Sequence, residues 1–370
     1  MNKLLLSRNN QTDIEIELKI PNGEKPRPRD VHISVEFLRL GEIDTIGEKF
    51  YAEVCIRSTW IENENFSNYN SQVHWNPNLY IENSLLEPKQ EINYVISKFY
   101  DMTRVKEVRF VKGYFWERLE LENFPLDTQE LSIVVSSKLT NHEIDIIQDP
   151  DSPSFIDFKA SRIFVDQQKW DLFKFVSVGY VASYDLPNPR DSKADQNYVI
   201  YQNKMIKIHP KFVATCFVAR KPGYYVFNAY FIIFLITILS LTTFSINCKL
   251  PQARLQTSFT LVLTSASFKW VINRSLPTIS YMTSLDKYAI VCIFYLCIIC
   301  IWHSMIGTLW EDHDFASRLD YWVLIVFLVI FLFIHAVFTF WLFKCYNNLR
   351  SLHKMNDKYI NELKEKSNFE

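Results

Sequence analysis

Three long apolar segments in the second half of the chain constrain its fold more than any other feature. Each contains about 20 mostly apolar residues, enough to cross a hydrocarbon core of about 30 Å as an α-helix. They cover residues 225–246, 288–309 and 321–343. One such segment is also compatible with a buried helix of a soluble protein, but three close together predict a membrane protein.

A fourth segment, RLQTSFTLVLTSASFKWVINRSLP (254–277), is far more polar than its neighbours. On a period of 3.6 residues one helix face carries Gln256, Thr260, Leu263, Ser267, Trp270 and Arg274. Polar groups in a bilayer are costly unless they face protein or water. Several copies around an axis would let this face line a water-filled path, in which Leu263 forms an apolar ring that closes by dewetting. Alternatively, the hydroxyls bond to carbonyls of their own helix or to neighbouring helices.

The first 220 residues read as strands separated by turns. Segments rich in Val, Ile, Phe, Tyr and Thr cover residues 31–40, 49–60, 108–121, 130–137 and 211–220. Many short strands at this spacing predict an all-β antiparallel sandwich. We expect a sandwich domain over 1–220, a four-helix membrane domain over 221–345 and a charged tail over 346–370. The expected membrane helices lie at about 225–246, 254–273, 286–309 and 320–344, and the tail is either a solvated helix or disordered.

The charge balance points to no nucleic-acid partner. The 370 residues include 40 basic and 41 acidic side chains, a net charge of -1, whereas nucleic-acid binders carry a basic excess or stripe. Possible metal ligands near the membrane are His303, His313, His335, Glu311, Asp312 and Asp314. No nucleophile elbow, phosphate loop or HExxH motif accompanies them, so we expect no enzyme, no metal and no cofactor.

The cysteines and the N-terminal residues add two expectations. Seven cysteines are spread over the chain; Cys297 and Cys300 are expected to be small packing residues, while Cys55 and Cys216 are candidates for a disulfide. The opening MNKLLLSRNN lacks the apolar region of a secretory leader. If the first domain is extracellular, a natural leader is expected to have been removed.

Five motifs occur in the order found in one receptor family. They are WNPNLYIEN (75–83), NFPLDTQEL (123–131), RKPGYY (220–225), RLQTSFTLVLT (254–264) and LPTISYMTSLDKY (276–288). Over residues 31–343 the chain resembles the pentameric ligand-gated ion channels, or Cys-loop receptors. The resemblance implies an extracellular sandwich of about ten strands above a four-helix bundle, assembled as a homopentamer around a central pore. It also implies a small-molecule agonist bound between neighbouring subunits.

Two departures from the family pattern resemble its prokaryotic members. In the family, two cysteines close the loop that contains NFPLDTQEL, called here the signature loop. They should fall at Glu117 and Leu131, so that disulfide is absent. The link between the third and fourth membrane helices, 307–319, is too short for the intracellular domain of animal receptors.

The agonist site implied by the resemblance lacks several of the aromatic residues that surround the ligand in the family. Expected aromatics fall on Cys55, Glu82 and Lys138, while other candidates near the agonist loops are Tyr80, Tyr184, Tyr198 and Tyr201. Capture of an amine by cation–π contact needs exposed aromatic faces, which argues against an acetylcholine-like ligand. Lys138 and Glu82 would suit a zwitterion or an anion, or they are simply solvated surface charges.

Coupling between the two domains is expected where the sandwich meets the membrane. By resemblance the candidates are Asp44, Phe124, Pro125, Asp127, Arg220 and Pro277. Arg220 beside a carboxylate would make a charge-assisted contact that can differ between two states. The alternative is that Phe124–Pro125 is only a turn, capped by Asp127.

Fixed charges near the polar helix bear on ion selectivity. Ala253–Arg254 resembles the anion-selective pattern, Arg274 adds a positive ring, and no acidic residue lies between Lys249 and Leu285. These features favour anions. The similarity of RLQTSFTL to a cation channel argues for cations, and Arg254 can also point into protein. A non-conducting receptor or adhesion protein is the other alternative.

The expected location is the plasma membrane, with the sandwich outside and the helices in contact with lipid. Lys344, Arg350 and Lys354 follow the fourth helix. The positive-inside rule would place them in the cytoplasm, whereas the family places this terminus outside. We follow the family, because a large translocated domain can override the charge of a tail.

Overall fold

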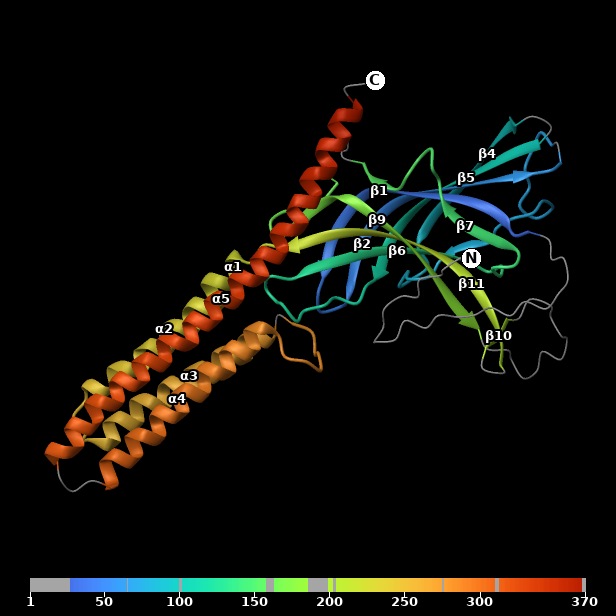
Figure 1. Cartoon of the computed structure of the whole chain (residues 1–370). Coiled ribbons are helices and arrows are strands. Elements are labelled where there is room, and N and C mark those ends of the chain that lie inside the picture. The colour runs from blue at the N-terminus through green and yellow to red at the C-terminus, as the bar shows by residue number, and fades with distance from the viewer. Residues whose placement is uncertain are drawn as a thin grey trace.

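The chain forms a two-sheet sandwich followed by four long helices (Figure 1). The computed structural model describes residues 27–64, 66–99, 102–157, 163–185, 199–201, 204–274, 276–309 and 313–367. The sandwich lies at one end of the molecule, and the helices extend away from it. The predicted order of strands and then helices is therefore confirmed.

Eleven strands lie within the described residues. They are β1 (Arg29–Asp44), β2 (Lys49–Glu62), β3 (Leu79–Ile81), β4 (Lys89–Phe99), β5 (Met102–Trp116), β6 (Thr128–Ser137), β7 (Ile144–Gln148), β8 (Phe155–Ile156), β9 (Trp170–Asp185), β10 (Val199–Tyr201) and β11 (Lys204–Arg220). β5 ends at Trp116 and not near residue 121 as predicted. The residues that follow it instead close a loop by hydrogen bonds that involve Glu117 and Glu120.

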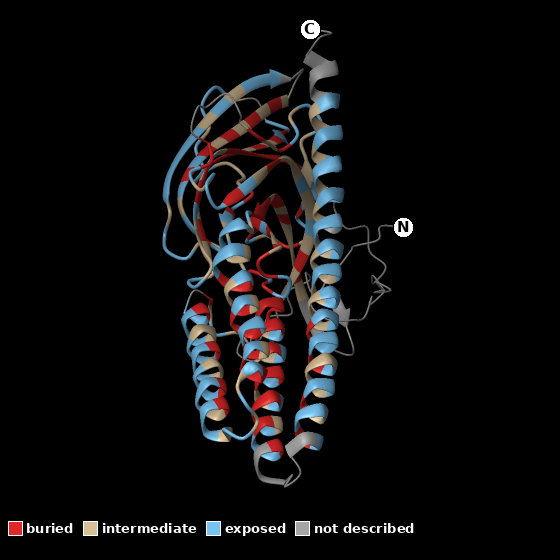
Figure 2. Cartoon of the chain, turned by 90° about the vertical axis from the view of Figure 1, so that its left-hand side faces the viewer, coloured by how far each residue is buried: buried red, intermediate tan, exposed pale blue. Residues whose placement is uncertain are grey.

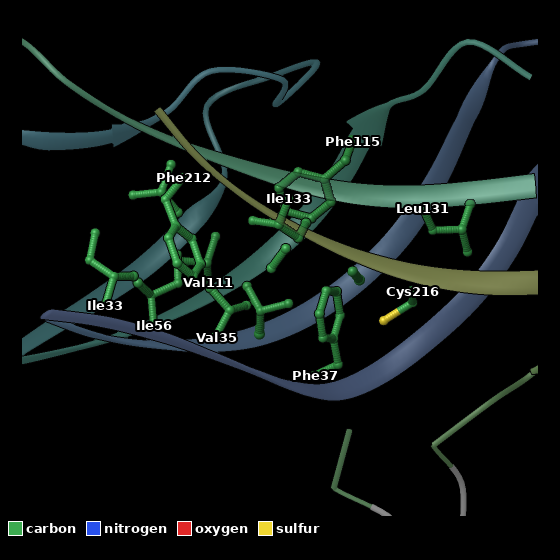
Figure 3. Packing of buried hydrophobic residues seen from close by; sticks show 14 of the residues in the cluster. Ile33, Val35, Phe37, Ile56, Val111, Phe115, Leu131, Ile133, Phe212 and Cys216 are labelled. Atoms are coloured by element: carbon green, nitrogen blue, oxygen red, sulfur yellow. The ribbon is translucent and has the colours of Figure 1, made fainter. Parts of the chain in front are cut away.

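The two sheets enclose one apolar core. One sheet has the order β4-β5-β2-β1-β7, with β8 also paired to β1; the other has the order β10-β11-β6-β3, with β9 also paired to β11. In β2, buried and less buried residues largely alternate, as expected for a strand with one face toward a core. Figure 3 shows side chains from both sheets meeting between them, among them Val35, Phe37, Val111, Ile133 and Phe212.

The helical part begins three residues after β11 ends. The first span, Gly223–Ser245, consists of α1 (Gly223–Tyr225), a π-helical turn η1 (Val226–Tyr230), α2 (Phe231–Thr242) and a 3₁₀ turn η2 (Thr243–Ser245). It is followed by α3 (Pro251–Asn273), α4 (Ser284–Leu309) and α5 (His313–Ser367). The first span, α4 and α5 are long and apolar enough to cross a membrane. The polar helix α3 does not meet that criterion, although it lies in the same bundle.

The last helix is longer than predicted. α5 runs to Ser367, whereas we expected a membrane helix ending near residue 344 and a separate charged tail. No glycine or proline, the residues that most disfavour a helix interior, occurs in residues 313–367. Residues 346–367 thus form the solvated helix of the two alternatives, which continues α5 beside the sandwich with most side chains exposed (Figures 1 and 2).

Candidate functional site: the domain junction and the polar helix

A buried ion pair lies where the sandwich joins the first membrane helix. Arg220, the last residue of β11, donates from Nε to Oδ1 of Asp127 at 2.8 Å and from Nη2 to Oδ2 at 3.1 Å. Its backbone N–H also donates to the Asp127 carbonyl at 3.1 Å. The two residues are 7% and 3% exposed. A buried guanidinium is tolerated because this fork-to-fork geometry neutralises it and uses its donors.

Aromatic rings enclose this ion pair. The Arg220 guanidinium lies 4.1 Å from the ring centre of Trp170 and 4.9 Å from that of Phe124. Gln129 donates from Nε2 to Oδ2 of Asp127 at 2.6 Å. The contacts hold the last residue of β11 in one position relative to the loop between β5 and β6.

That loop reaches the membrane helices through polar contacts. The Leu121 N–H donates to the hydroxyl of Tyr281 at 3.0 Å. Ser284, the first residue of α4, donates to the Glu122 carbonyl from its backbone N–H at 3.0 Å and from Oγ at 2.8 Å. The loop that leaves the sandwich is therefore bonded to the segment between α3 and α4.

The same loop packs into an apolar cluster with the membrane helices. Phe124 is fully buried and its ring centre lies 4.5 Å from that of Tyr225. The Phe124–Pro125 peptide bond is cis. Leu276, which precedes the half-buried Pro277, belongs to this cluster. The predicted coupling residues Phe124, Pro125, Asp127 and Arg220 thus come together, with Pro277 beside the cluster.

Asp44 has a local partner in its own turn. Its Oδ1 accepts the backbone N–H groups of Ile46 and Gly47, each at 3.0 Å, and Lys49 lies 3.8 Å from Oδ2. The carboxylate therefore caps the turn between β1 and β2. The described contacts of Asp44 are therefore local to this turn, whereas Arg220 contacts Asp127 and Phe124.

Hydrogen bonds close the loop between β5 and β6 near Glu117 and Leu131, where the resemblance would place two cysteines. Oε2 of Glu117 accepts the Ser132 N–H at 2.9 Å, and the Gln129 side chain bonds to the backbone N–H and carbonyl of Glu120 at 3.0 and 2.9 Å. Burial raises the pKa of Glu117 to about 7, and the neighbouring Glu130 carboxylate contributes to the rise. All seven cysteines are free, so Cys55 and Cys216 are unpaired core residues.

The polar face of α3 points away from its own subunit. Gln256, Thr260, Leu263, Ser267, Trp270 and Arg274 are all exposed. The opposite face of the helix, with Arg254, Ser258, Ser265 and Ile272, is buried. Thr260 donates from Oγ1 to the Gln256 carbonyl at 2.8 Å, as the alternative interpretation of the hydroxyls predicts.

Arg254 lies inside the bundle instead of on this exposed face. It is 1% exposed and donates from Nη2 to Oδ2 of Asp320 on α5 at 2.7 Å. Oδ1 of Asp320 accepts the Trp302 indole N–H of α4 at 2.9 Å, and the Arg254 Nε donates to the Ile246 carbonyl at 2.7 Å. The positive charge is therefore paired within the subunit, while Ala253 beside it is exposed.

Trp270 and Arg274 form a stacked pair at the other end of α3. The Arg274 guanidinium lies 3.9 Å from the centre of the Trp270 ring system, and both side chains are exposed. Residues one turn apart on a helix face each other, so this cation–π contact follows from their spacing.

Sequence comparison supports the resemblance indicated by the motifs. No protein-family model matches the chain. The human gamma-aminobutyric acid receptor subunit gamma-1 is 23% identical over 288 residues, which cover 73% of this chain and 56% of the relative. The human subunit gamma-3 is 23% identical over 309 residues, or 80% of this chain and 59% of the relative. A subunit beta of the same receptor from Caenorhabditis elegans is 24% identical over 179 residues, or 48% of this chain and 28% of the relative.

The chain is a distant homologue of gamma-aminobutyric acid receptor subunits. It spans a little more than half the length of the gamma subunits it matches. The homologues are receptor subunits and not enzymes. Together with three helices able to cross a membrane, this homology makes the chain an integral membrane protein and supports the ligand-gated channel family.

The structure describes the positions of most, but not all, of the predicted agonist residues. Tyr80 on β3 is 36% exposed, Lys138 is exposed, and Glu82 forms an ion pair with Lys211 of β11. Tyr184 and Tyr201 occupy positions on β9 and β10, and Tyr198 lies outside the described residues. Because Glu82 already has a basic partner in its own subunit, it is less suited than Lys138 to meet a ligand charge.

His303 and His335, which the sequence offers as possible metal ligands, contact different residues. His303 contacts Thr243 through Nε2 at 2.7 Å, and His335 contacts Tyr288 through Nε2 at 3.1 Å. Among the described residues no group of three His, Cys, Asp or Glu side chains could hold a metal. Glu311 and Asp312 lie outside the described part of the chain.

Several residues of the junction and the bundle had no predicted role. They are Trp170, Tyr281, Ser284, Trp302 and Asp320. Asp320 carried a usable signal, because a lone carboxylate at the start of an apolar helix needs a partner. The others are ordinary aromatic or hydroxyl residues in sequence, and only their long-range contacts distinguish them.

Proposed function

We propose that this chain is the subunit of a homopentameric ligand-gated ion channel whose pore is lined by α3. The observation that carries the proposal is the exposed polar face of α3, with Gln256, Thr260 and Ser267 on one side of a helix in an apolar bundle. A single subunit leaves this face uncovered. Five copies around an axis would turn it toward water, and Leu263 would form the apolar constriction.

The junction supports gating of this pore by the sandwich. The loop that holds Asp127 against Arg220 also bonds to Tyr281, between α3 and α4, and to Ser284, the first residue of α4. A displacement of β11 or of the loop is therefore passed to the end of the pore helix through direct contacts. This arrangement suits a receptor in which ligand binding outside changes a pore inside the membrane.

We propose anion selectivity, with cation selectivity as the alternative. Arg254 is paired with Asp320 and buried, so its charge supports neither preference. The exposed charges at the two ends of α3 are Lys249 and Arg274, and no acidic residue occurs between Lys249 and Leu285. Five copies of this lining would carry net positive charge.

The agonist is proposed to be a small molecule bound between neighbouring subunits near Tyr80, Lys138, Tyr184, Tyr198 and Tyr201, with the sandwich outside the plasma membrane. The relatives are receptors for gamma-aminobutyric acid by name, and Lys138 offers an exposed positive charge to a carboxylate. Gamma-aminobutyric acid is therefore the first compound to apply.

Planar-bilayer recording of the purified full chain tests this function. In a potassium chloride gradient with gamma-aminobutyric acid and other small amino acids and amines applied in turn, we expect ligand-evoked currents that reverse near the chloride equilibrium potential. Reversal near the potassium potential would select the cation alternative. No current under any ligand, together with intact protein, would favour a non-conducting receptor or adhesion protein. Native mass measurement should give five copies.

A further inference from the structure

Strand β9 connects the domain junction with the predicted agonist region. It begins at Trp170, whose ring stacks on Arg220. Its far end carries Tyr184, one of the predicted agonist residues. Within the described residues β9 pairs with β11 along one edge, and its other edge has no strand partner.

The pairing of β9 with β11 is interrupted close to the junction. Val218 lies opposite Leu172, and Cys216 lies opposite Val176, so Phe217 alone faces the three residues between them. An interruption of this kind is a β-bulge, which frees backbone groups from the ladder and redirects side chains. The residues of the bulge are Phe173, Lys174 and Phe175.

The C-terminal part of α5 covers this bulge. Oδ1 of Asn356 accepts the backbone N–H of Lys174 at 2.6 Å, and the ring of His353 packs edge-on at 5.0 Å from that of Phe173. Phe173 is 1% exposed. One helix face is half-buried along this stretch and carries Leu349, Leu352, Asn356, Tyr359 and Ile360, whereas the intervening side chains are mostly exposed.

We propose that Asn356 is a positioning residue for gating, which fixes β9 at its bulge. With this point held by the membrane helix α5, a displacement at the Tyr184 end is directed to Trp170 and Arg220 instead of being absorbed by the bulge. The inference rests on the proposed function for its link to gating. The contact also joins α5, whose apolar span is largely exposed in the single subunit, to the strand of the predicted agonist region.

Hydrogen–deuterium exchange of the full chain in lipid nanodiscs tests the positioning role without an agonist. The variants are Asn356→Ala, Asn356→Asp, which keeps a carboxyl oxygen as the acceptor, and Asn361→Ala, a matched change on the exposed face of the same helix. In Asn356→Ala we expect about fivefold faster exchange at residues 171–177 and also at 216–221 around Arg220. Asn356→Asp and Asn361→Ala should behave as the unchanged chain.

Each result decides between the alternatives. If Asn356→Ala exchanges its amides at the same rate as the unchanged chain, Asn356 does not hold β9 and the proposal is wrong. Faster exchange confined to residues 171–177 would reduce Asn356 to a local structural role, as would equal effects of Asn356→Ala and Asn361→Ala. Bilayer recording with gamma-aminobutyric acid is run in parallel: a silent unchanged chain counts against the proposed channel function, whereas the exchange pattern alone judges the positioning of β9.

Discussion

Arg220 and Asp127 form a bidentate ion pair within the protein, with Nε–Oδ1 and Nη2–Oδ2 distances of 2.8 and 3.1 Å. The pair joins the last sandwich strand to the loop that bonds to α4. It thereby fixes the end of β11, from which the first membrane helix continues, against the loop that contacts α4. Its loss should therefore separate ligand binding from pore opening.

Arg220→Gln should abolish ligand-evoked current while the protein still assembles. Removing one partner of a buried pair costs about 3–5 kcal/mol, so a lower thermal midpoint is expected as well. The double variant Arg220→Gln/Asp127→Asn removes both charges and should recover most of the stability but none of the current. Currents equal to those of the unchanged chain in either variant would show that this pair does not couple the domains.

Leu263→Ser should open the channel without ligand. Leu263 is 68% exposed on the polar face of α3, and a hydroxyl in place of an isobutyl group would wet the apolar ring that we propose as the gate. Phe259→Ser is the control, because Phe259 is also exposed (58%) but lies off that face. Bilayer recordings should show basal current for Leu263→Ser alone; equal basal currents would argue against α3 as the pore helix in this orientation.

Asp320→Asn should destabilise the protein more than the double variant Asp320→Asn/Arg254→Gln. The single change leaves the buried Arg254 charge unpaired, at a cost of about 3–5 kcal/mol, while the double change removes both charges.

Because Arg254 does not lie on the exposed face, the double variant should keep the reversal potential of the unchanged chain. Arg274→Gln, at an exposed site, should shift it toward the cation potential. A shift in the double variant would place Arg254 in the ion path.

Stability should fall as the pH rises through the range in which Glu117 ionises. Burial raises the pKa of Glu117 to about 7, above the value near 4.5 of an unfolded chain. The folded state therefore binds the proton more tightly, and its stabilisation is complete below about pH 4.5 and is lost as the pH rises to about 7. The amplitude is on the order of 3 kcal/mol.

Thermal unfolding of the unchanged chain and of Glu117→Gln between pH 4.5 and 8 measures this effect. The amide keeps an oxygen for the Ser132 N–H but cannot ionise, so the variant should lose this part of the pH dependence and be the more stable protein at pH 8. The same slope in both proteins would assign the pH dependence to other groups.

Local patterns predicted the main elements well. Alternating β-branched and aromatic residues indicated the strands now seen as β1, β2, β6 and β11, and apolar length indicated the three helices able to span a membrane. The six residues that the period of α3 places on one face are all exposed, although Phe259, off that face, is exposed as well. These successes share a cause, since the repeats of 2 and 3.6 residues are properties of neighbouring residues.

Partners distant in sequence were not predictable in the same way. The resemblance of Ala253–Arg254 to the anion-selective pattern makes Arg254 a candidate selectivity charge, yet it bonds to Asp320, 66 residues away. Asp44 was considered as a coupling residue by resemblance, yet its carboxylate caps its own turn. From the sequence, Glu117 is identified only as the position at which the resemblance expects a cysteine. Its raised pKa follows from its burial against β6, which the sequence does not show.

The sequence by itself determined that strands precede residue 220, that helices follow it, and that one helix of the bundle carries a polar face. The tertiary structure alone decided that Arg220 meets Asp127, that Arg254 is neutralised inside the bundle, and that α5 continues to Ser367 and covers the β9 bulge. The physical reason is that periodicity acts through adjacent turns of one element. The partner of a buried charge or an open strand edge is chosen by packing between elements far apart in the chain.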